Sequence, residues 1–382
     1  MKNNFQFHNP TQLIFGRGTI AQLAQKLPKY EKILVTYGSG SVKQNGVYEQ
    51  IAKALQGFNY VEFWGIDPNP TVETLRKAIA LGKQEQITYI LAVGGGSVID
   101  GAKLISSAIP YAGDAWELVL NPSKIEKMIP FASVLTLPAT GSEMNCGAVI
   151  SNAEKQEKYA FYSSFPQFSI LDPEATFSLP EFQIACGIAD TFIHVLEQYL
   201  TVTDESPLMD RWSEGIMQTL IELATKIKAD KTNYEAMAEF MLCATMALNG
   251  FTAMGVTEDW ATHLIGHEIT ALHGVTHGQT LAIVLPGLMK VMREQKKAKL
   301  LQFGARVFNI KKSTEPQRID KTIAACEMFF RSIGLATKLH ELNIGAETVT
   351  TIKERFINRG TKLGECENID GYIVEEILKQ CL

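Results

Sequence analysis

The fold of this chain is decided by the stretch Tyr89-Ile90-Leu91-Ala92-Val93-Gly94-Gly95-Gly96-Ser97-Val98-Ile99-Asp100. Its apolar start predicts a buried strand, and residues 98–107 have the apolar spacing of a helix. Backbone amides at the start of such a helix can bind a pyrophosphate. The spacing is not the Rossmann GxGxxG, because the third glycine is missing. On these residues alone, glycines that merely permit a tight turn remain an alternative.

Strand and helix signals alternate on both sides of this stretch. Residues 32–36 and 60–63 predict strands with a helical segment between them, and residues 71–83 predict a helix. Such alternation predicts a mostly parallel sheet with helices on both faces, which binds ligands beyond the carboxyl ends of its strands. After about residue 180 long helical patterns take over, at residues 181–200, 210–229 and 234–249. We therefore expect a Rossmann-like α/β domain, residues 1–180, followed by an all-helical domain, residues 181–382.

The composition is typical of a globular protein. In 382 residues, 36 Lys and Arg stand against 41 Asp and Glu, and no basic block could follow a phosphate backbone, so nucleic-acid binding is not expected. No apolar run approaches the roughly 20 residues that span a bilayer. Because Lys2-Asn3-Asn4 begins no secretory signal, we expect no membrane association and a cytoplasmic location. The six cysteines contain no CxxC pair and are expected to be free, mostly buried thiols.

A second glycine-bearing turn, Tyr37-Gly38-Ser39-Gly40-Ser41, follows the strand at residues 33–36 and contains no carboxylate. Sites selective for NAD often place an Asp or Glu against the ribose 2′-hydroxyl, where it would repel the 2′-phosphate of NADP. The amides and hydroxyls of Gly38, Ser39, Gly40 and Ser41 would accept that phosphate, and Lys43 is a candidate partner for it. The turn therefore favours NADP(H) over NAD(H).

Carboxylate and imidazole side chains recur at helical spacing in the second half of the chain. The pairs are Asp190 with His194, His263 with His267, and His273 with His277. Residues four apart lie on one helix face, although Gly274 and Gly278 make a continuous helix doubtful for the last pair. Four of the seven histidines fall within residues 262–278, and such a set suits a divalent first-row metal. Spacing alone leaves His267, His273 and His277 as equal candidates.

Other metal or nucleotide chemistries fit less well. His267-Glu268 begins the HExxH motif of metalloproteases, but Ala271 occupies the place of the second histidine. Phosphoryl transfer lacks its GxxxxGK[ST] motif, and histidine-rich sites suit Mg²⁺ poorly. Hydride transfer uses both ends of the chain, because a metal polarises the carbonyl or alcohol oxygen and a nicotinamide supplies or accepts hydride. A nucleotide-binding protein without catalysis is the alternative of another class, and it predicts an incomplete ligand set.

The motifs together resemble the iron-containing, or group III, alcohol dehydrogenase family over nearly the whole chain. They are Ile14-Phe15-Gly16-Arg17-Gly18, Pro68-Asn69-Pro70, Gly94-Gly95-Gly96-Ser97 with Asp100, Leu137-Pro138-Ala139-Thr140-Gly141-Ser142-Glu143, Asp190 with His194, His263-Leu264-Ile265-Gly266-His267, His273-Gly274 and His277-Gly278. Thr36-Tyr37-Gly38 and Asp259-Trp260-Ala261-Thr262-His263 are most similar to the bacterial branch of NADPH-dependent aldehyde reductases and butanol dehydrogenases. That branch usually has a third glycine where Ser39 stands.

This resemblance implies a division of roles among the residues. The metal, Fe²⁺ or Zn²⁺, would be held by Asp190, His194, His263 and His277, with His267 as a catalytic residue beside the nicotinamide and His273 in a supporting role. The implied contacts to the cofactor come from Asn69, Gly94, Gly95, Gly96, Ser97, Asp100, Thr136, Thr140, Asn145 and Lys158. The implied reaction interconverts an aldehyde and a primary alcohol with NADP(H), in a homodimer. An NAD-dependent polyol dehydrogenase, acting on glycerol or a diol, is the alternative on the same fold.

Four apolar residues next to the histidines allow two interpretations. Trp260, Leu264, Ile265 and Leu272 are either the wall of an apolar substrate pocket or ordinary core residues, because helix packing needs the same residue types.

Overall fold

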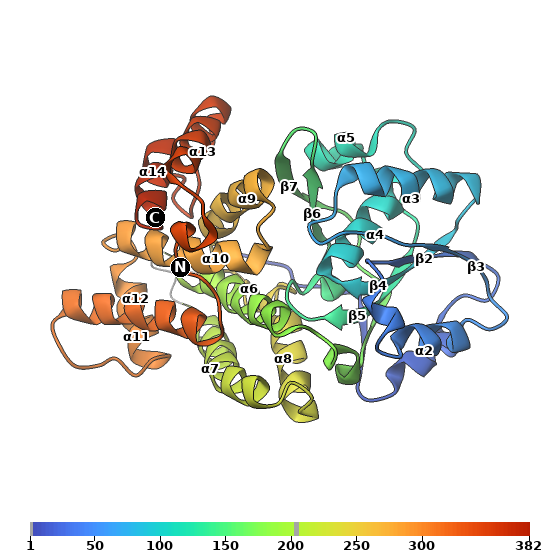
Figure 1. Cartoon of the computed structure of the whole chain (residues 1–382), viewed down its shortest axis with the longest axis horizontal. Helices are drawn as coiled ribbons and strands as arrows, with labels where there is room; N and C mark the ends of the chain where they lie inside the picture. Colours follow the sequence, from blue (N-terminus) through green and yellow to red (C-terminus); the bar gives the residue numbers. More distant parts are fainter. Residues whose placement is uncertain (1–2, 202–205) are drawn as a thin grey trace. The chain divides into compact units, whose positions relative to one another are not determined.

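The computed structural model describes residues 3–201 and 206–382, which divide into two compact units (Figure 1). The sheet unit consists of His8–Pro180 and Asp230–Asn249. The helical unit consists of the described residues of Met1–Phe7, Glu181–Ala229 and Gly250–Leu382. This grouping differs from residues 1–180 and 181–382 in two segments, since α8 (Tyr234–Ala247) lies in the sheet unit and the first residues in the helical one. The two expected domains stay a prediction.

The sheet unit is built on a six-stranded, fully parallel sheet. Its strands, in the order β1-β8-β5-β4-β2-β3, are β1 (Gln12–Phe15), β8 (Phe168–Leu171), β5 (Phe131–Leu137), β4 (Tyr89–Gly95), β2 (Lys32–Tyr37) and β3 (Asn59–Phe63). The parallel Rossmann-like sheet predicted from the sequence is thereby confirmed. A separate antiparallel hairpin of β6 (Gly147–Asn152) and β7 (Glu157–Tyr162) was not anticipated.

Each face of this sheet is covered by helices. The helices of the unit are η1 (Thr19–Gln22), α1 (Leu23–Lys26), η2 (Ser41–Lys43), α2 (Val47–Ala54), α3 (Val72–Gln84), α4 (Gly96–Ala108), α5 (Ala115–Leu120), η3 (Pro122–Lys124), η4 (Ser142–Met144), η5 (Pro173–Thr176) and α8. Alternate residues of β4 enter different cores: Ile90 packs in the cluster with α3 and α4, and Leu91 in the cluster with α2. Strands buried on both faces explain the continuous apolar runs.

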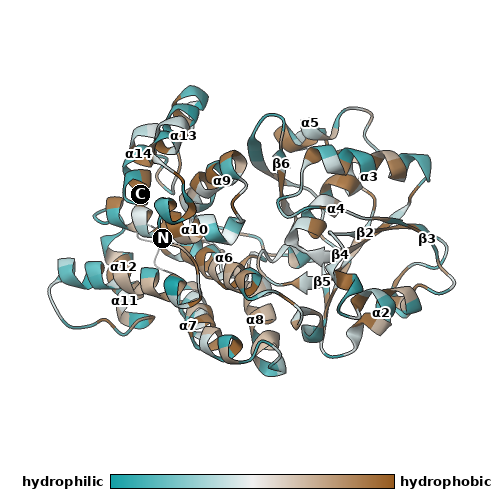
Figure 2. Cartoon of the chain, in the orientation of Figure 1, coloured by the Kyte–Doolittle hydropathy of each residue, from teal (hydrophilic) through white to brown (hydrophobic). Residues whose placement is uncertain are grey.

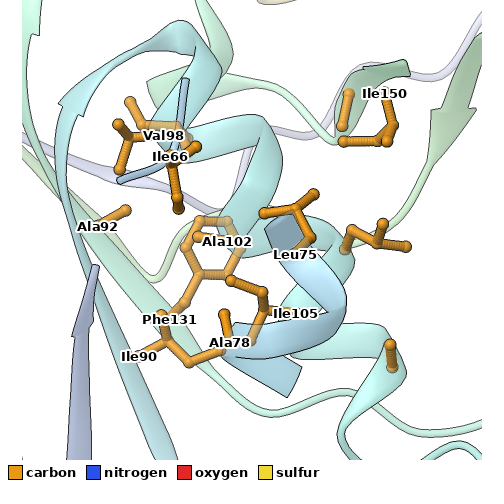
Figure 3. Packing of buried hydrophobic residues seen from close by; sticks show 14 of the residues in the cluster. Ile66, Leu75, Ala78, Ile90, Ala92, Val98, Ala102, Ile105, Phe131 and Ile150 are labelled. Carbon is orange, nitrogen blue, oxygen red and sulfur yellow. The ribbon is translucent and has the colours of Figure 1, made fainter. Parts of the chain in front are cut away.

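The core under α3 and α4 is drawn in Figure 3, where Leu75 of α3 and Ala102 of α4 lie near Phe131 of β5. Ile150 of β6 belongs to the same cluster, so the hairpin is fixed to the helices on this face. This packing holds the start of α4 at the carboxyl end of β4.

The helical unit contains the long helices expected from the sequence. They are α6 (Glu181–Tyr199), α7 (Pro207–Ala229), α9 (Ala261–His273), α10 (His277–Val291), α11 (Lys297–Arg306), α12 (Glu315–Ser332), η6 (Leu339–Leu342), α13 (Ala346–Arg359) and α14 (Gly371–Lys379). Figure 2 shows hydrophobic colours along much of α6 and α10, which pack on each other and are buried over most of their length. Within residues 3–201 and 206–382, none of the helices combines the length and apolarity needed to span a bilayer.

Two smaller expectations are confirmed. The helix containing His273 ends at that residue and is followed by Gly274 with a φ of 67°, and a new helix begins at His277, so the two histidines do not share one helix. All six cysteines are free thiols, four of them buried.

Candidate functional site

The candidate metal centre is formed by α6, α9 and α10 of the helical unit. Asp190 Oδ1 lies 3.5 Å from His194 Nε2, 3.6 Å from His263 Nε2 and 3.7 Å from His277 Nε2. Ligand atoms of Asp190, His263 and His277 all lie within 4.8 Å of one another. The structure therefore gathers all four residues of the expected ligand set around one carboxylate oxygen.

The donor set fits a divalent first-row metal ion. Nε2 of His263 is buried and has no hydrogen-bond partner among the described residues. Burying an unpaired nitrogen costs folding free energy unless a bound species, such as a metal ion, contacts it. Three imidazoles and one carboxylate are ligands that Fe²⁺ and Zn²⁺ both accept. Of the four side chains only that of His277 is more than slightly exposed, at 20%.

Gly278 explains how α10 brings His277 to this centre. A Cβ atom at position 278 would lie 2.2 Å from the backbone oxygen of Cys186 on α6. Only glycine therefore lets the first turn of α10 approach the backbone of α6 this closely. The consequence is that His277, the preceding residue, reaches Asp190 one turn further along α6.

His267 lies beside the centre but outside the group of ligand atoms. It follows His263 by about one turn of α9, and its ring centroid is 5.1 Å from that of His277 and 6.5 Å from that of His263. The group of ligand atoms within 4.8 Å of one another contains Asp190, His263 and His277, and His194 adjoins it with Nε2 3.5 Å from Asp190 Oδ1, so the role of His267 outside the ligand set stays a prediction. His273 is separate from the centre, because its Nε2 is 2.9 Å from Thr348 Oγ1 on α13. The geometry thus separates His273 from the histidines of the centre.

The other residues noted near the histidines divide between core and site. Glu268 accepts hydrogen bonds from Arg355 and Arg359 of α13 at 3.0 and 2.5 Å. Its carboxylate is therefore paired with two arginines instead of serving as the general base of a metalloprotease. Ile265 and Leu272 pack in the core of the unit, and Leu264 is exposed. Trp260 lies close to the ligands, with its ring centroid 5.1 Å from that of His263.

Sequence reasoning missed Glu197, which contacts His263 directly. Nδ1 of His263 and Oε2 of Glu197 form a short hydrogen bond, and the Glu197 carboxylate is buried away from solvent. Burial lowers the pKa of His263, but the charges of Glu197 and Asp190 outweigh this and raise it to about 9. The available signal was helical spacing, because Glu197 follows Asp190 by seven residues and His194 by three, on one face of α6.

The candidate pyrophosphate site is the turn between β4 and α4. A Cβ on Gly94 would lie 2.5 Å from Val98 Cγ2, and one on Gly96 would lie 2.4 Å from Thr140 Oγ1. Neither glycine has a positive φ, so close packing, rather than a special backbone conformation, requires them. No side chain caps the start of α4, where Ser97 is the second residue. Gly96, Ser97 and Thr140 are therefore brought together at a helix start with open amides.

The second glycine turn follows β2, the neighbour of β4 in the sheet. Tyr37 pairs with Val93, so the residues 38–41 and 94–97 leave adjacent carboxyl ends. The ammonium group of Lys43 lies 3.9 Å from the centroid of the Trp64 ring. A cation is thus held at the end of the turn where the sequence predicted a partner for a 2′-phosphate.

Other residues expected to bind the cofactor are engaged within the protein. Asp100 accepts hydrogen bonds from Ser142 Oγ at 2.5 Å and from the Val149 amide at 2.9 Å. Asn145 Oδ1 accepts from Lys103 Nζ at 3.0 Å, and the burial of this lysine lowers its pKa to about 8. Both side chains thereby fix the loop that follows β5, and their contact with a cofactor stays a prediction.

The last three expected cofactor residues are Asn69, Thr136 and Lys158 of the sheet unit. Lys158 of β7 donates a hydrogen bond to Asn69 Oδ1 at 2.8 Å, which joins two of them. Asn69 adopts a positive φ of 56°. Thr136 is buried near the end of β5. Their contact with a nucleotide also stays a prediction.

The parallel sheet, the glycine turns and the histidine–carboxylate cluster occur together in a known family of proteins. Residues 10–173 match the family described as iron-containing alcohol dehydrogenase, and residues 184–382 match the C-terminal region of the Fe-containing alcohol dehydrogenase family. The chain belongs to the iron-containing alcohol dehydrogenase family, and it is an oxidoreductase.

Individual relatives extend this likeness over the full length. The NADPH-dependent aldehyde reductase YqhD of Escherichia coli is 46% identical over 96% of both chains. A probable NADH-dependent butanol dehydrogenase of Bacillus subtilis is 39% identical over 99% of this chain and 100% of its own. The crystal structure of E. coli YqhD superposes with a TM-score of 0.98 at 44% identity, covering 100% of this chain and 99% of that one. An NADH-dependent butanol dehydrogenase of Thermotoga maritima gives 0.95 at 35% identity, with the same coverage.

Proposed function

We propose that this protein reduces short aliphatic aldehydes to primary alcohols, with NADPH as the hydride donor and one divalent metal held by Asp190, His194, His263 and His277. The observation that carries this proposal is the cluster of three imidazoles around Asp190 Oδ1. A complete ligand set argues against a nucleotide-binding protein without catalysis. The names of the relatives support the reaction, since they include an NADPH-dependent aldehyde reductase and butanol dehydrogenases.

Each group has a defined task in this reaction. A bound divalent ion polarises the substrate oxygen, and three neutral imidazoles with one carboxylate would leave the ion a net charge near +1. His267, beside the ligands, exchanges a proton with the substrate oxygen, directly or through water. The amides at the start of α4 bind the pyrophosphate of the nucleotide. Trp260, an apolar neighbour of His263, favours unsubstituted alkyl chains over polyols.

The choice of NADPH rests on the turn after β2. Gly38, Ser39, Gly40 and Ser41 offer amides and hydroxyls without a carboxylate, and Lys43 supplies a positive charge at the end of the turn. Relatives use both cofactors by name, so this part of the proposal depends on the residues of the turn themselves. The metal is Fe²⁺ or Zn²⁺, and Zn²⁺ outcompetes Fe²⁺ at most such sites. We also propose a cytoplasmic homodimer, by resemblance to the family.

The proposal is tested by following the absorbance of NADPH and NADH with butanal, using protein loaded with a known metal. We expect kcat/KM for NADPH to exceed that for NADH by about tenfold, the value of one charge-assisted hydrogen bond. If neither NADPH nor NADH is consumed, the proposed reaction is wrong. A preference for NADH would overturn the cofactor, and faster turnover of glycerol with NAD would favour a polyol dehydrogenase.

Replacing His267 with alanine is expected to slow turnover without releasing the metal. The His267 ring lies near the ligands but outside their group, so kcat should fall by about 10²- to 10⁴-fold, the usual contribution of an acid–base residue. Metal content by elemental analysis, together with the pH dependence of kcat, measures both effects. Loss of metal in this variant would show that His267 is a ligand instead.

A further inference from the structure

Glu197 holds both the ring of His263 and the helix that carries it. Its Oε2 accepts a hydrogen bond from His263 Nδ1, and its Oε1 accepts one from the Thr262 amide at 2.6 Å. Its backbone oxygen accepts a third from the Asp259 amide at 3.0 Å. The side chain is 3% exposed, so both carboxylate oxygens act inside the protein rather than in water.

The start of α9 depends partly on this carboxylate because the residue at its capping position contributes no side-chain hydrogen bond. Trp260 occupies the capping position with a positive φ of 63° and contributes no side-chain cap. The first free amide, of Ala261, is satisfied by Asp259 Oδ1 at 2.7 Å, and the second, of Thr262, by Glu197. Glu197 therefore fixes the first turn of α9, from which His263 projects.

The hydrogen bond to Nδ1 also decides which nitrogen of His263 faces the metal centre. A neutral imidazole carries one proton, and a carboxylate can only accept, so that proton sits on Nδ1. Nε2 is then left with its lone pair directed toward Asp190 and the other histidines. Such support commonly changes metal affinity by about 10- to 100-fold.

We propose that Glu197 is a positioning residue of the metal centre, which fixes the tautomer and orientation of His263 so that its Nε2 can bind the ion. This inference rests on the proposed metal site. It predicts that Glu197 acts through His263 and not through the general stability of the helical unit.

The Glu197→Gln variant separates these two possibilities. A glutamine carbonyl can still accept from the Thr262 amide, which preserves the start of α9. Its NH₂ group would then face His263 Nδ1 as a donor and would favour the tautomer with the proton on Nε2. If the amide is turned the other way, two donors face each other at Thr262 instead. The second orientation is costly because two donors meet, whereas in the first His263 can change its tautomer, so we expect the first orientation, which opposes metal binding without removing a ligand.

The test measures the Kd of the full-length apoprotein for Zn²⁺ by competition with a chromophoric chelator. We expect Glu197→Gln to raise the Kd by about 10- to 100-fold. Glu268→Gln is the matched control, because Glu268 is also a buried carboxylate on the histidine helices, and its contacts are to Arg355 and Arg359 of α13. We expect this control to lower the melting temperature but to leave the Zn²⁺ affinity unchanged.

A double-mutant comparison tests whether Glu197 acts through His263. In a His263→Ala background, the three remaining ligands hold Zn²⁺ too weakly to retain it through purification, so their Kd is measured at raised Zn²⁺ concentration. Adding Glu197→Gln there should change this Kd by less than about twofold, because the ring that Glu197 positions is gone. Equal Zn²⁺ affinity of wild type and Glu197→Gln would overturn the inference, as would equal losses in both backgrounds. If Glu197→Gln and Glu197→Asp both fail to fold, the residue is structural and the inference is wrong. If the wild type itself binds no Zn²⁺, the proposed metal site fails instead.

Discussion

Replacing His263 with alanine is expected to remove the metal ion and turnover together. His263 Nε2 is buried 3.6 Å from Asp190 Oδ1, and its removal leaves three of the four proposed donor atoms for the ion. Metal-assisted polarisation of a carbonyl contributes several kcal/mol, so kcat should fall by about 10³-fold or more. Elemental analysis and the butanal assay on the same preparation measure both effects. A variant that keeps its metal and its rate would show that the ligand assignment is wrong.

His273→Ala is the matched control for this experiment. His273 lies on the same helix, but its Nε2 contacts Thr348 Oγ1 at 2.9 Å instead of the ligand cluster. Its loss should cost about 1 kcal/mol of folding free energy, the value of one hydrogen bond. Metal content and kcat should stay within about twofold of wild type, because no ligand is changed.

Replacing Gly96 with alanine is expected to weaken nucleotide binding while leaving the metal in place. The added Cβ would lie 2.4 Å from Thr140 Oγ1, so either this threonine or the first turn of α4 must move. Overpacking of this kind costs about 1–3 kcal/mol, which corresponds to a rise in the Kd for NADPH of about 10- to 100-fold. Nucleotide fluorescence titration measures this Kd. An unchanged affinity would show that the nucleotide does not bind at this turn.

The control for the glycine experiment is Gly215→Ala. Gly215 lies within α7, and a Cβ there would have no atom within 4 Å. Alanine is favoured over glycine inside a helix by roughly 0.5–1 kcal/mol, so this variant should be at least as stable as wild type. Its nucleotide and metal affinities should be unchanged.

The parallel sheet could be predicted because strands buried on both faces leave a strong signal. β4 begins with the apolar run of residues 89–93 and β2 contains the buried apolar run Ile33-Leu34-Val35, and each strand is followed by glycines and a helix. The β6–β7 hairpin was missed because apolar and polar residues do not alternate in its sequence, GAVISN and EKYAFY, although buried and half-buried positions alternate along β6. The helix α8 was recognised, but its place was not, since only tertiary packing shows that Met241 joins the core with α3 and α4.

The candidate site shows the same limit. Helical spacing found the residue pairs, because Asp190 and His194 are neighbours within one helix. It could not choose His277 over His273, since that choice depends on α10 packing against α6 at Gly278. Glu197 escaped notice because its partner, His263, lies 66 residues away. Asp100 stands next to the glycine turn, yet its hydrogen bonds to Ser142 and Val149 could be known only from the folded chain.

The central claim, metal-dependent hydride transfer from NADPH to an aldehyde carbon, is tested most directly by isotope transfer. Protein loaded with Zn²⁺ or Fe²⁺ is incubated with butanal and NADPH deuterated at both C4 positions, and the butanol is analysed by mass spectrometry. We predict one deuterium atom per butanol molecule with loaded protein and no butanol with metal-free protein. Butanol without deuterium, or no butanol from either loaded form, would contradict the claim.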